Sequence, residues 1–245
     1  MNTSQKVAFI TGGNRGIGLE TARGLGKLGI DVVIGVRDPD KGEEAVAALR
    51  AEGIHASAIH FDAEKPASFA SIRDHFERAY GRLDILVNNA GIALADFFAP
   101  NASTVSQDVL RRTFDINFFA VIELTQTLLP LIRKAPAGRI VNLSSILGSL
   151  GAHSAPDSPI GPAKELAYNA SKTALNAFTV HLAAELKDTP IKVNSAHPGW
   201  VKTDMGGPNA PMDLADGGKT SVQLATLPAD GPTGGYFHLG EALPW

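Results

Sequence analysis

Short apolar runs alternate with amphipathic stretches along the chain, and this alternation restricts the fold more than any other feature of the sequence. The runs are mostly apolar throughout, which is typical of parallel strands buried on both faces. The stretches between them repeat apolar residues every three or four positions, as helices do. Such alternation predicts a parallel sheet with right-handed crossovers. The expected strands cover 6–11, 32–36, 57–61, 83–88, 139–144 and 191–195.

A length of 245 residues predicts one large domain. We expect an α/β fold whose helices cover 17–28, 41–52, 68–80, about 113–134 and about 164–187. Segments at about 148–165 and about 199–213 are rich in Gly and Pro and follow strands. Both should lie at the carboxyl edge of the sheet, where doubly wound folds bind ligands.

Charge and composition exclude several classes of protein. The 22 Lys and Arg and 25 Asp and Glu leave a net charge of −3, all of it within residues 206–245. A neutral body argues against nucleic-acid or anionic-membrane partners. The absence of cysteine excludes disulfides and thiolate chemistry, and the seven histidines show no metal-ligand spacing. The apolar stretch 116–132 is short and interrupted by polar residues, so we expect a cytoplasmic protein without a metal.

A glycine-rich turn follows the first strand and leads into the first helix. Glycines let the backbone approach a pyrophosphate, and the helix N-terminus supplies free N–H groups. The spacing G-x-x-x-G-x-G differs from the G-x-G-x-x-G fingerprint, and an ordinary turn is the alternative. The turn predicts a dinucleotide site formed by Gly12, Asn14, Arg15, Gly16, Ile17 and Gly18.

The residue after the second strand indicates which dinucleotide binds. An acid there would bind the ribose 2′-OH of NAD, whereas an arginine accommodates the 2′-phosphate of NADP. Arg37 stands at this position, and Arg15 is within reach of the same phosphate. Two arginines favour NADP(H) over NAD(H). The alternative is that Asp38 reads the ribose and Arg37 is a solvated charge.

Tyr168 and Lys172 are four residues apart at the start of a predicted helix, so both lie on one face. Tyrosine, with a pKa of about 10, is a poor acid–base catalyst at neutral pH. An ammonium about 4 Å away contributes about 4 kcal/mol at an effective dielectric of 20, enough to lower that pKa toward 7. The pair alone occurs by chance in many helices.

Further motifs occur in a fixed order over nearly the whole chain: T-G-x-x-x-G-I-G at 11–18, N-N-A-G at 88–91, Asn117, Ser144–Ser145, Y-x-x-x-K at 168–172 and P-G-W-V-K-T at 198–203. Together they resemble the short-chain dehydrogenase/reductase family. Arg37–Asp38, 198–205 and 230–245 are most similar to its NADPH-dependent carbonyl reductases. The resemblance implies a single-domain Rossmann fold with a doubly wound, seven-stranded parallel sheet and helices on both faces.

The resemblance also assigns catalytic roles. Tyr168 would protonate the reduced carbonyl oxygen, and Lys172 would lower its pKa and bind the nicotinamide ribose. Ser145 would hold the substrate oxygen, with Ser144 as its rival. Asn117 would hold a water that links Lys172 to solvent, or would instead satisfy backbone groups in a helix kink.

On the coenzyme side, the resemblance implies that Asn89 and Ala90 line the adenosine ribose, although Asn88 and Asn89 could be structural turn residues. Asp62 would bind the adenine amine or cap a helix, and Thr203 would contact the carboxamide. Further expected coenzyme contacts are Ala63, Gly91, Pro198, Gly199 and Val201.

About ten residues more than in compact family members separate Ser145 from Tyr168. The extra segment, about 149–164, would be part of a substrate lid or else a surface loop. The resemblance implies that a longer insertion here is associated with monomers among the carbonyl reductases. The insertion in this chain is shorter, so the sequence leaves both a monomer and a homo-oligomer open.

Apolar side chains at the same edge predict a hydrophobic ketone or aldehyde as substrate, although each could be local core instead. The expected pocket residues are Leu94, Phe97, Ile146, Leu147, Trp200 and Met205, with Met212 beside them. A 3-oxoacyl-thioester reductase is the alternative, but it would need a basic docking patch. A non-catalytic NADP-binding sensor would be expected to have lost the Tyr or the Lys.

Overall fold

The computed structural model describes residues 5–245, and one sheet forms its centre. The strand order is β3-β2-β1-β4-β5-β6-β7-β8. The strands are β1 (Val7–Thr11), β2 (Asp31–Val36), β3 (Ala56–His60), β4 (Ile85–Asn88), β5 (Arg139–Leu143), β6 (Lys192–Ala196), β7 (Tyr236–His238) and β8 (Glu241–Ala242). Strands β1 to β7 are parallel, which confirms the expected sheet.

The eighth strand is a small addition to the seven expected. Leu239 and Gly240 both have positive φ, 47° and 90°, and turn the chain back on itself. Strand β8 then pairs antiparallel with β7. Consecutive residues with positive φ are typical of two-residue hairpins, which explains why so short a strand forms here.

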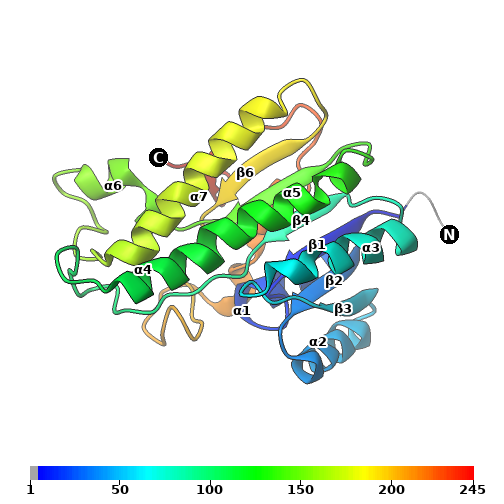
Figure 1. Cartoon of the computed structure of the whole chain (residues 1–245), viewed down its shortest axis with the longest axis horizontal. Coiled ribbons are helices and arrows are strands. Elements are labelled where there is room, and N and C mark those ends of the chain that lie inside the picture. The colour runs from blue at the N-terminus through cyan, green and yellow to red at the C-terminus, as the bar shows by residue number, and fades with distance from the viewer. Residues whose placement is uncertain (1–4) are drawn as a thin grey trace.

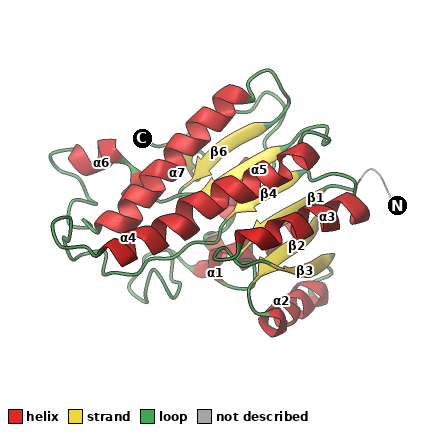
Figure 2. Cartoon of the chain, in the orientation of Figure 1, coloured by secondary structure: helices red, strands yellow, loops and turns green. Residues whose placement is uncertain are grey.

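Helices cover both faces of the sheet (Figure 2). They are α1 (Gly16–Lys27), α2 (Pro39–Ala51), α3 (Phe69–Ala79), α4 (Gln107–Phe114), α5 (Ala120–Ile132), α6 (Leu150–Ser154), α7 (Leu166–Glu185) and α8 (Lys219–Ala225). Helices α3, α5 and α7 pack on the face that faces the viewer in Figure 1. Helices α1, α2 and α8 pack on the other face.

Successive residues along a strand place their side chains alternately in these two hydrophobic cores. Phe9 belongs to the core under α3, α5 and α7, whereas Ile10 belongs to the core under α1, α2 and α8. Both side chains are fully buried. Burial on both faces is the physical reason that the strands are mostly apolar instead of alternating.

The single helix expected over about 113–134 begins earlier and is interrupted. Asp115–Phe119 forms a π-helical turn between α4 and α5. The continuous stretch Gln107–Ile132 is apolar and long enough to cross a membrane by composition, but half of its most apolar window is buried inside the protein. The side of this stretch that faces the sheet packs into the hydrophobic core, as in a core helix of a globular protein.

A row of buried polar side chains crosses the centre of the sheet. Asn88 on β4 donates one hydrogen bond to Thr125 Oγ1 (3.0 Å) and one to Asn142 Oδ1 on β5 (2.8 Å). Asn142 Nδ2 donates to Thr179 Oγ1 on α7 (2.9 Å), whose hydroxyl pairs with Ser195 on β6 (2.9 Å). This row connects three strands and two helices next to the carboxyl edge.

Replacing Asn142 by Ala should lower the free energy of unfolding by about 2–4 kcal/mol, because it leaves buried donors unpaired and opens a cavity. Urea denaturation measures the change. Asn209→Ala, at an exposed position, is the matched control and should stay within about 0.5 kcal/mol of the wild type. Equal stabilities for the two variants would contradict a structural role for the polar row.

Candidate active site

The expected coenzyme residues gather at the carboxyl edge of the sheet because parallel strands all end there. One group lies in the turn from β1 into α1: Gly12, Asn14, Arg15, Gly16, Ile17 and Gly18. The others follow β3, β4 and β6: Asp62, Ala63, Asn89, Ala90, Gly91, Pro198, Gly199, Val201 and Thr203.

The glycines of this turn leave space beside the backbone that the Cβ of any other residue would occupy. Gly12 and Gly16 have positive φ, 65° and 55°. A Cβ on Gly18 would come within 2.4 Å of the Gly12 carbonyl oxygen. A Cβ on Gly16 would meet nothing nearer than Thr203, at 3.8 Å. Helix α1 begins at Gly16 without a side-chain cap, so its first N–H groups are available to a phosphate. These residues fit a dinucleotide.

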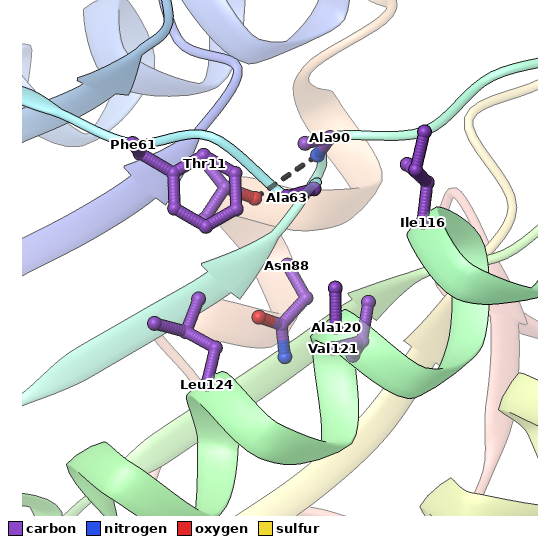
Figure 3. A pocket seen from close by; sticks show the side chains of 9 residues that line it. All are labelled: Thr11, Phe61, Ala63, Asn88, Ala90, Ile116, Ala120, Val121 and Leu124. Atoms are coloured by element: carbon purple, nitrogen blue, oxygen red, sulfur yellow. Dashed lines mark hydrogen bonds between the residues drawn. The ribbon is translucent and has the colours of Figure 1, made fainter. Parts of the chain in front are cut away.

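Asn89 fastens this turn to β4. Its Nδ2 donates to the carbonyl oxygens of Thr11 (2.7 Å) and Gly12 (3.2 Å). The Thr11 hydroxyl in turn accepts the N–H groups of Asn89 and Ala90. A cavity of about 10 Å³, close to the space one water needs, lies beneath Ala90 (Figure 3). Through its hydrogen bonds to Thr11 and Gly12, the Asn89 side chain holds the glycine turn in place.

The residues expected to read the ribose have distinct surroundings. Asp38 caps α2 by accepting the N–H of Asp40 at 3.1 Å. Arg37 is exposed and lies 3.9 Å from Glu64. Arg15 forms an exposed ion pair with Asp204. The carboxylate of Asp38 thus already has a structural role, whereas both arginines extend into solvent.

Asp62 is 6% exposed and sits in a turn after β3. Its Oδ1 accepts the N–H of Glu64 at 3.1 Å, and its Oδ2 lies 3.4 Å from Lys65 Nζ. The turn, and not a helix cap, holds this side chain in place.

Tyr168 and Lys172 lie in the first two turns of α7, and both are buried. The Lys172 Nζ donates to the Leu143 carbonyl oxygen at 2.8 Å and lies 5.5 Å from the centre of the Tyr168 ring. Ser145, two residues beyond Leu143, lies close enough to Tyr168 for its hydroxyl to oppose the increase in the pKa of the phenol. Ser144 is turned toward Tyr236 instead, and neither of those two hydroxyls has a hydrogen-bond partner within 3.5 Å.

Burial dominates the pKa values of this pair. It raises the pKa of Tyr168 to about 12, and the nearby Ser145 hydroxyl opposes the increase only in part. It lowers the pKa of Lys172 to about 8. The net pKa of Tyr168 is therefore raised and not lowered toward 7 as the sequence predicted, because burial removes the hydration of the phenolate.

Asn117 lies in the π-helical turn, and backbone groups hold its amide. Its Oδ1 accepts the N–H of Ile92 (2.8 Å), and its Nδ2 donates to the Ile92 carbonyl (2.9 Å) and to Ser171 Oγ (3.0 Å). A Cβ on Gly91 would lie 3.2 Å from Asn117 Oδ1 and 3.4 Å from Lys172 Nζ. The amide thus secures the chain beside Lys172.

Apolar side chains form the rim of the site. The ring of Phe97 meets the Tyr168 ring edge-on, with centroids 5.1 Å apart. Trp200 packs against Phe98 at 6.4 Å and donates from Nε1 to the Gly206 carbonyl (2.7 Å). Leu94 and Met205 are also exposed, while Ile146 and Leu147 are half-buried in the loop after Ser145.

The insertion lies beside the N-terminus of α7. His153 Nε2 lies 3.0 Å from the Leu147 carbonyl oxygen, and its Nδ1 lies 3.0 Å from Lys164 Nζ. The N–H of Gly151 donates to the backbone oxygen of Trp245 at 2.7 Å. These contacts tie the segment to the serine loop and to the last residues of the chain.

Three residues near the site were missed from the sequence. Glu165 caps α7, Phe98 packs on Trp200, and His197 Nδ1 accepts the N–H of Ile146 at 3.2 Å. Only Glu165 carried a signal, since an acidic residue often precedes a helix. Within residues 5–245, no cluster of three His, Asp or Glu side chains could hold a metal ion.

Comparison with known proteins shows which protein family the chain belongs to. The family model for short chain dehydrogenase matches residues 6–213. Mouse carbonyl reductase [NADPH] 1 is 34% identical over 288 aligned positions that cover all of both chains, so the alignment contains gaps. Short-chain dehydrogenase/reductase 1 of Saponaria officinalis is 30% identical, covering 98% of this chain and 96% of its own. The NADPH-bound carbonyl reductase from chicken fatty liver superposes with a TM-score of 0.84 at 28% identity, covering 98% of this chain and 99% of its own.

Lys172→Met should stabilise the protein by up to about 3 kcal/mol at pH 7, because a buried ammonium whose pKa falls to about 8 destabilises the folded state. The cost is complete below pH 8 and disappears as pH rises toward the ordinary lysine pKa, so the gain should shrink at pH 10. Urea denaturation at both values tests this, with exposed Lys187→Met as control. A gain independent of pH would contradict the electrostatic cause.

Proposed function

Because the chain belongs to the short-chain dehydrogenase/reductase family and resembles its NADPH-dependent carbonyl reductases over its full length, we propose that it reduces the carbonyl group of a hydrophobic ketone or aldehyde. The observation that carries this proposal is the cluster of Ser145, Tyr168 and Lys172 at the end of β5. NADPH, when bound, supplies the hydride.

Tyr168 is the proton donor in this proposal. A pKa of about 12 keeps its phenol protonated at neutral pH, as proton donation requires. The hydroxyls of Ser145 and Tyr168 would both donate to the substrate oxygen and stabilise its developing charge. As the proton leaves Tyr168 Oη for that oxygen, the Lys172 ammonium favours the phenolate.

The coenzyme side favours NADP(H) over NAD(H). Arg37 and Arg15 are exposed cations at the edge where the ribose would lie. Asp38, the rival reader of the ribose, uses its carboxylate to cap α2. A 2′-phosphate would replace weak, exposed ion pairs by charge-assisted hydrogen bonds.

An apolar rim supports a hydrophobic substrate. Four large apolar side chains at the rim are 41–58% exposed, and such clusters commonly mark binding sites: Leu94, Phe98, Trp200 and Met205. The nearby cations Arg15 and Lys202 are paired with Asp204 and Asp213. An uncharged carbonyl compound fits these surroundings better than a thioester on an acidic carrier protein. The insertion at 149–164 would form one wall of the pocket.

We expect a cytoplasmic enzyme that acts on small molecules, since the first 205 residues carry no net charge to attract nucleic acid or a membrane. The first experiment follows NADPH and NADH oxidation by absorbance with aryl ketones, cyclic ketones, aldehydes and an acetoacetyl thioester. Turnover of bulky apolar carbonyls supports the proposal. Turnover of the thioester alone would replace it by 3-oxoacyl reduction.

Tyr168→Phe should reduce kcat to background, because it removes the hydroxyl that would donate the proton, while the Kd for NADPH stays within twofold of the wild type. Steady-state assays and fluorescence titration measure the two quantities. Retention of kcat would refute the role of the phenol as proton donor.

Arg37→Asp should lower the ratio of kcat/KM for NADPH to that for NADH by at least tenfold, because it replaces an attractive charge near the 2′-phosphate by a repulsive one. Arg73→Asp, an exposed arginine on α3, is the control and should leave the ratio unchanged. An unchanged ratio in Arg37→Asp would mean that another group reads the ribose.

A further inference from the structure

Glu165 is a buried carboxylate at the start of the catalytic helix. Its side chain is 1% exposed. Within residues 5–245, no cation lies within 4 Å of its oxygens, so neutral N–H groups satisfy the charge. A buried carboxylate is costly unless its hydrogen bonds are strong and well directed. Its position, three residues before Tyr168, indicates which part of the site these bonds hold.

The bonds of Glu165 reach the backbone of Tyr168 itself. Glu165 Oε2 accepts the Tyr168 N–H at 2.6 Å, and Oε1 accepts the Ala167 N–H at 2.9 Å. These N–H groups belong to the first turn of α7, where no helical carbonyl can accept them. The negative charge is also favourable at a helix N-terminus. Glu165 therefore fixes the backbone from which the phenol of Tyr168 extends.

Asn101 connects the same cap to a second part of the site. Its Nδ2 donates to Glu165 Oε1 at 3.3 Å, and its Oδ1 accepts the Leu166 N–H at 3.0 Å. Asn101 lies in the loop between β4 and α4, which also carries Phe97. The Phe97 ring contacts the Tyr168 ring, so the loop is joined to α7 by its backbone and by its aromatic side chain.

We propose that Glu165, together with Asn101, is a positioning residue that fixes Tyr168 relative to Ser145 and holds the Phe97 loop against the catalytic helix. The proposal rests on the proposed carbonyl reduction. The proposal distinguishes proton transfer from coenzyme binding at the glycine turn. That turn lies between β1 and α1 and makes no contact with Glu165 or Asn101. Loss of the cap should therefore impair proton transfer and leave coenzyme binding intact.

Other caps in the chain show what an ordinary cap looks like. Ser106 caps α4 by accepting the Val109 N–H at 3.2 Å, and it is exposed. Glu165 is longer than a serine or aspartate, and its length allows one carboxylate to reach both the helix and Asn101. An aspartate at this position would still cap the helix, since Asp is among the best N-cap residues.

The test compares Glu165→Ala, Glu165→Asp and Ser106→Ala in the full-length protein. We expect kcat to fall about 10- to 100-fold in Glu165→Ala, as for a misplaced catalytic group, with the Kd for NADPH within twofold. Glu165→Asp should restore kcat to within about threefold, because it restores the cap. Ser106→Ala removes an ordinary, exposed cap on α4 and should keep the wild-type kcat.

Amide hydrogen exchange gives a readout that does not depend on turnover. The amides of Ala167 and Tyr168 should exchange at least tenfold faster in Glu165→Ala and at nearly wild-type rates in Glu165→Asp. Should Glu165→Ala fail to fold, Asn101→Ala tests the connection to the loop and should raise the KM for the carbonyl several-fold at constant Kd for NADPH.

Three results would overturn the proposal: a wild-type kcat in Glu165→Ala, an equal loss of kcat in Ser106→Ala, or an unchanged KM in Asn101→Ala. If the wild type reduces no carbonyl compound, that result refutes the proposed carbonyl reduction but not the positioning role of Glu165. Faster exchange at Ala167 and Tyr168 in Glu165→Ala would then still support the positioning role, and unchanged exchange would overturn it.

Discussion

The hydrogen bond from the buried Lys172 ammonium to the Leu143 carbonyl determines the geometry of the whole site. Leu143 is the last residue of β5, and Ser145 follows two residues later. Lys172 lies one helical turn after Tyr168 on α7. The bond therefore holds helix α7 against strand β5, with Ser145 close enough to Tyr168 to influence the pKa of its phenol. The polar row through Asn142 and Thr179 joins the same strand and helix deeper in the core.

Burial opposes charge throughout this region, and each charged group is stabilised differently. Burial keeps Tyr168 neutral by raising its pKa to about 12, and it lowers the pKa of Lys172 to about 8. Glu165 is surrounded by N–H donors at a helix N-terminus. A site built this way destabilises the fold to some degree, which is common where function requires buried charge.

The coenzyme and substrate sides share the loops after β4 and β6, whereas the glycine turn belongs to the coenzyme side. The glycine turn is fastened by Asn89 to the carbonyls of Thr11 and Gly12. The substrate side consists of the loop after β4 and the loop after β6, which meet through Phe98 and Trp200. The start of α7 adjoins both sides as well, because Lys172 lies beside Gly91 and the Tyr168 ring contacts Phe97.

Local patterns in the sequence determined the parallel sheet, the glycine turn and the set of family motifs, because burial on both faces and phosphate binding leave a signature within a few residues. Tertiary structure decided the rest. The π-helical turn at Asn117, the hairpin at Leu239 and the contact of Asn101 with Glu165 leave no periodic pattern in the sequence from which they could be predicted. The increase in the pKa of Tyr168 was also not predicted from the sequence, because spacing reveals a neighbouring charge but not the burial that desolvates the phenol.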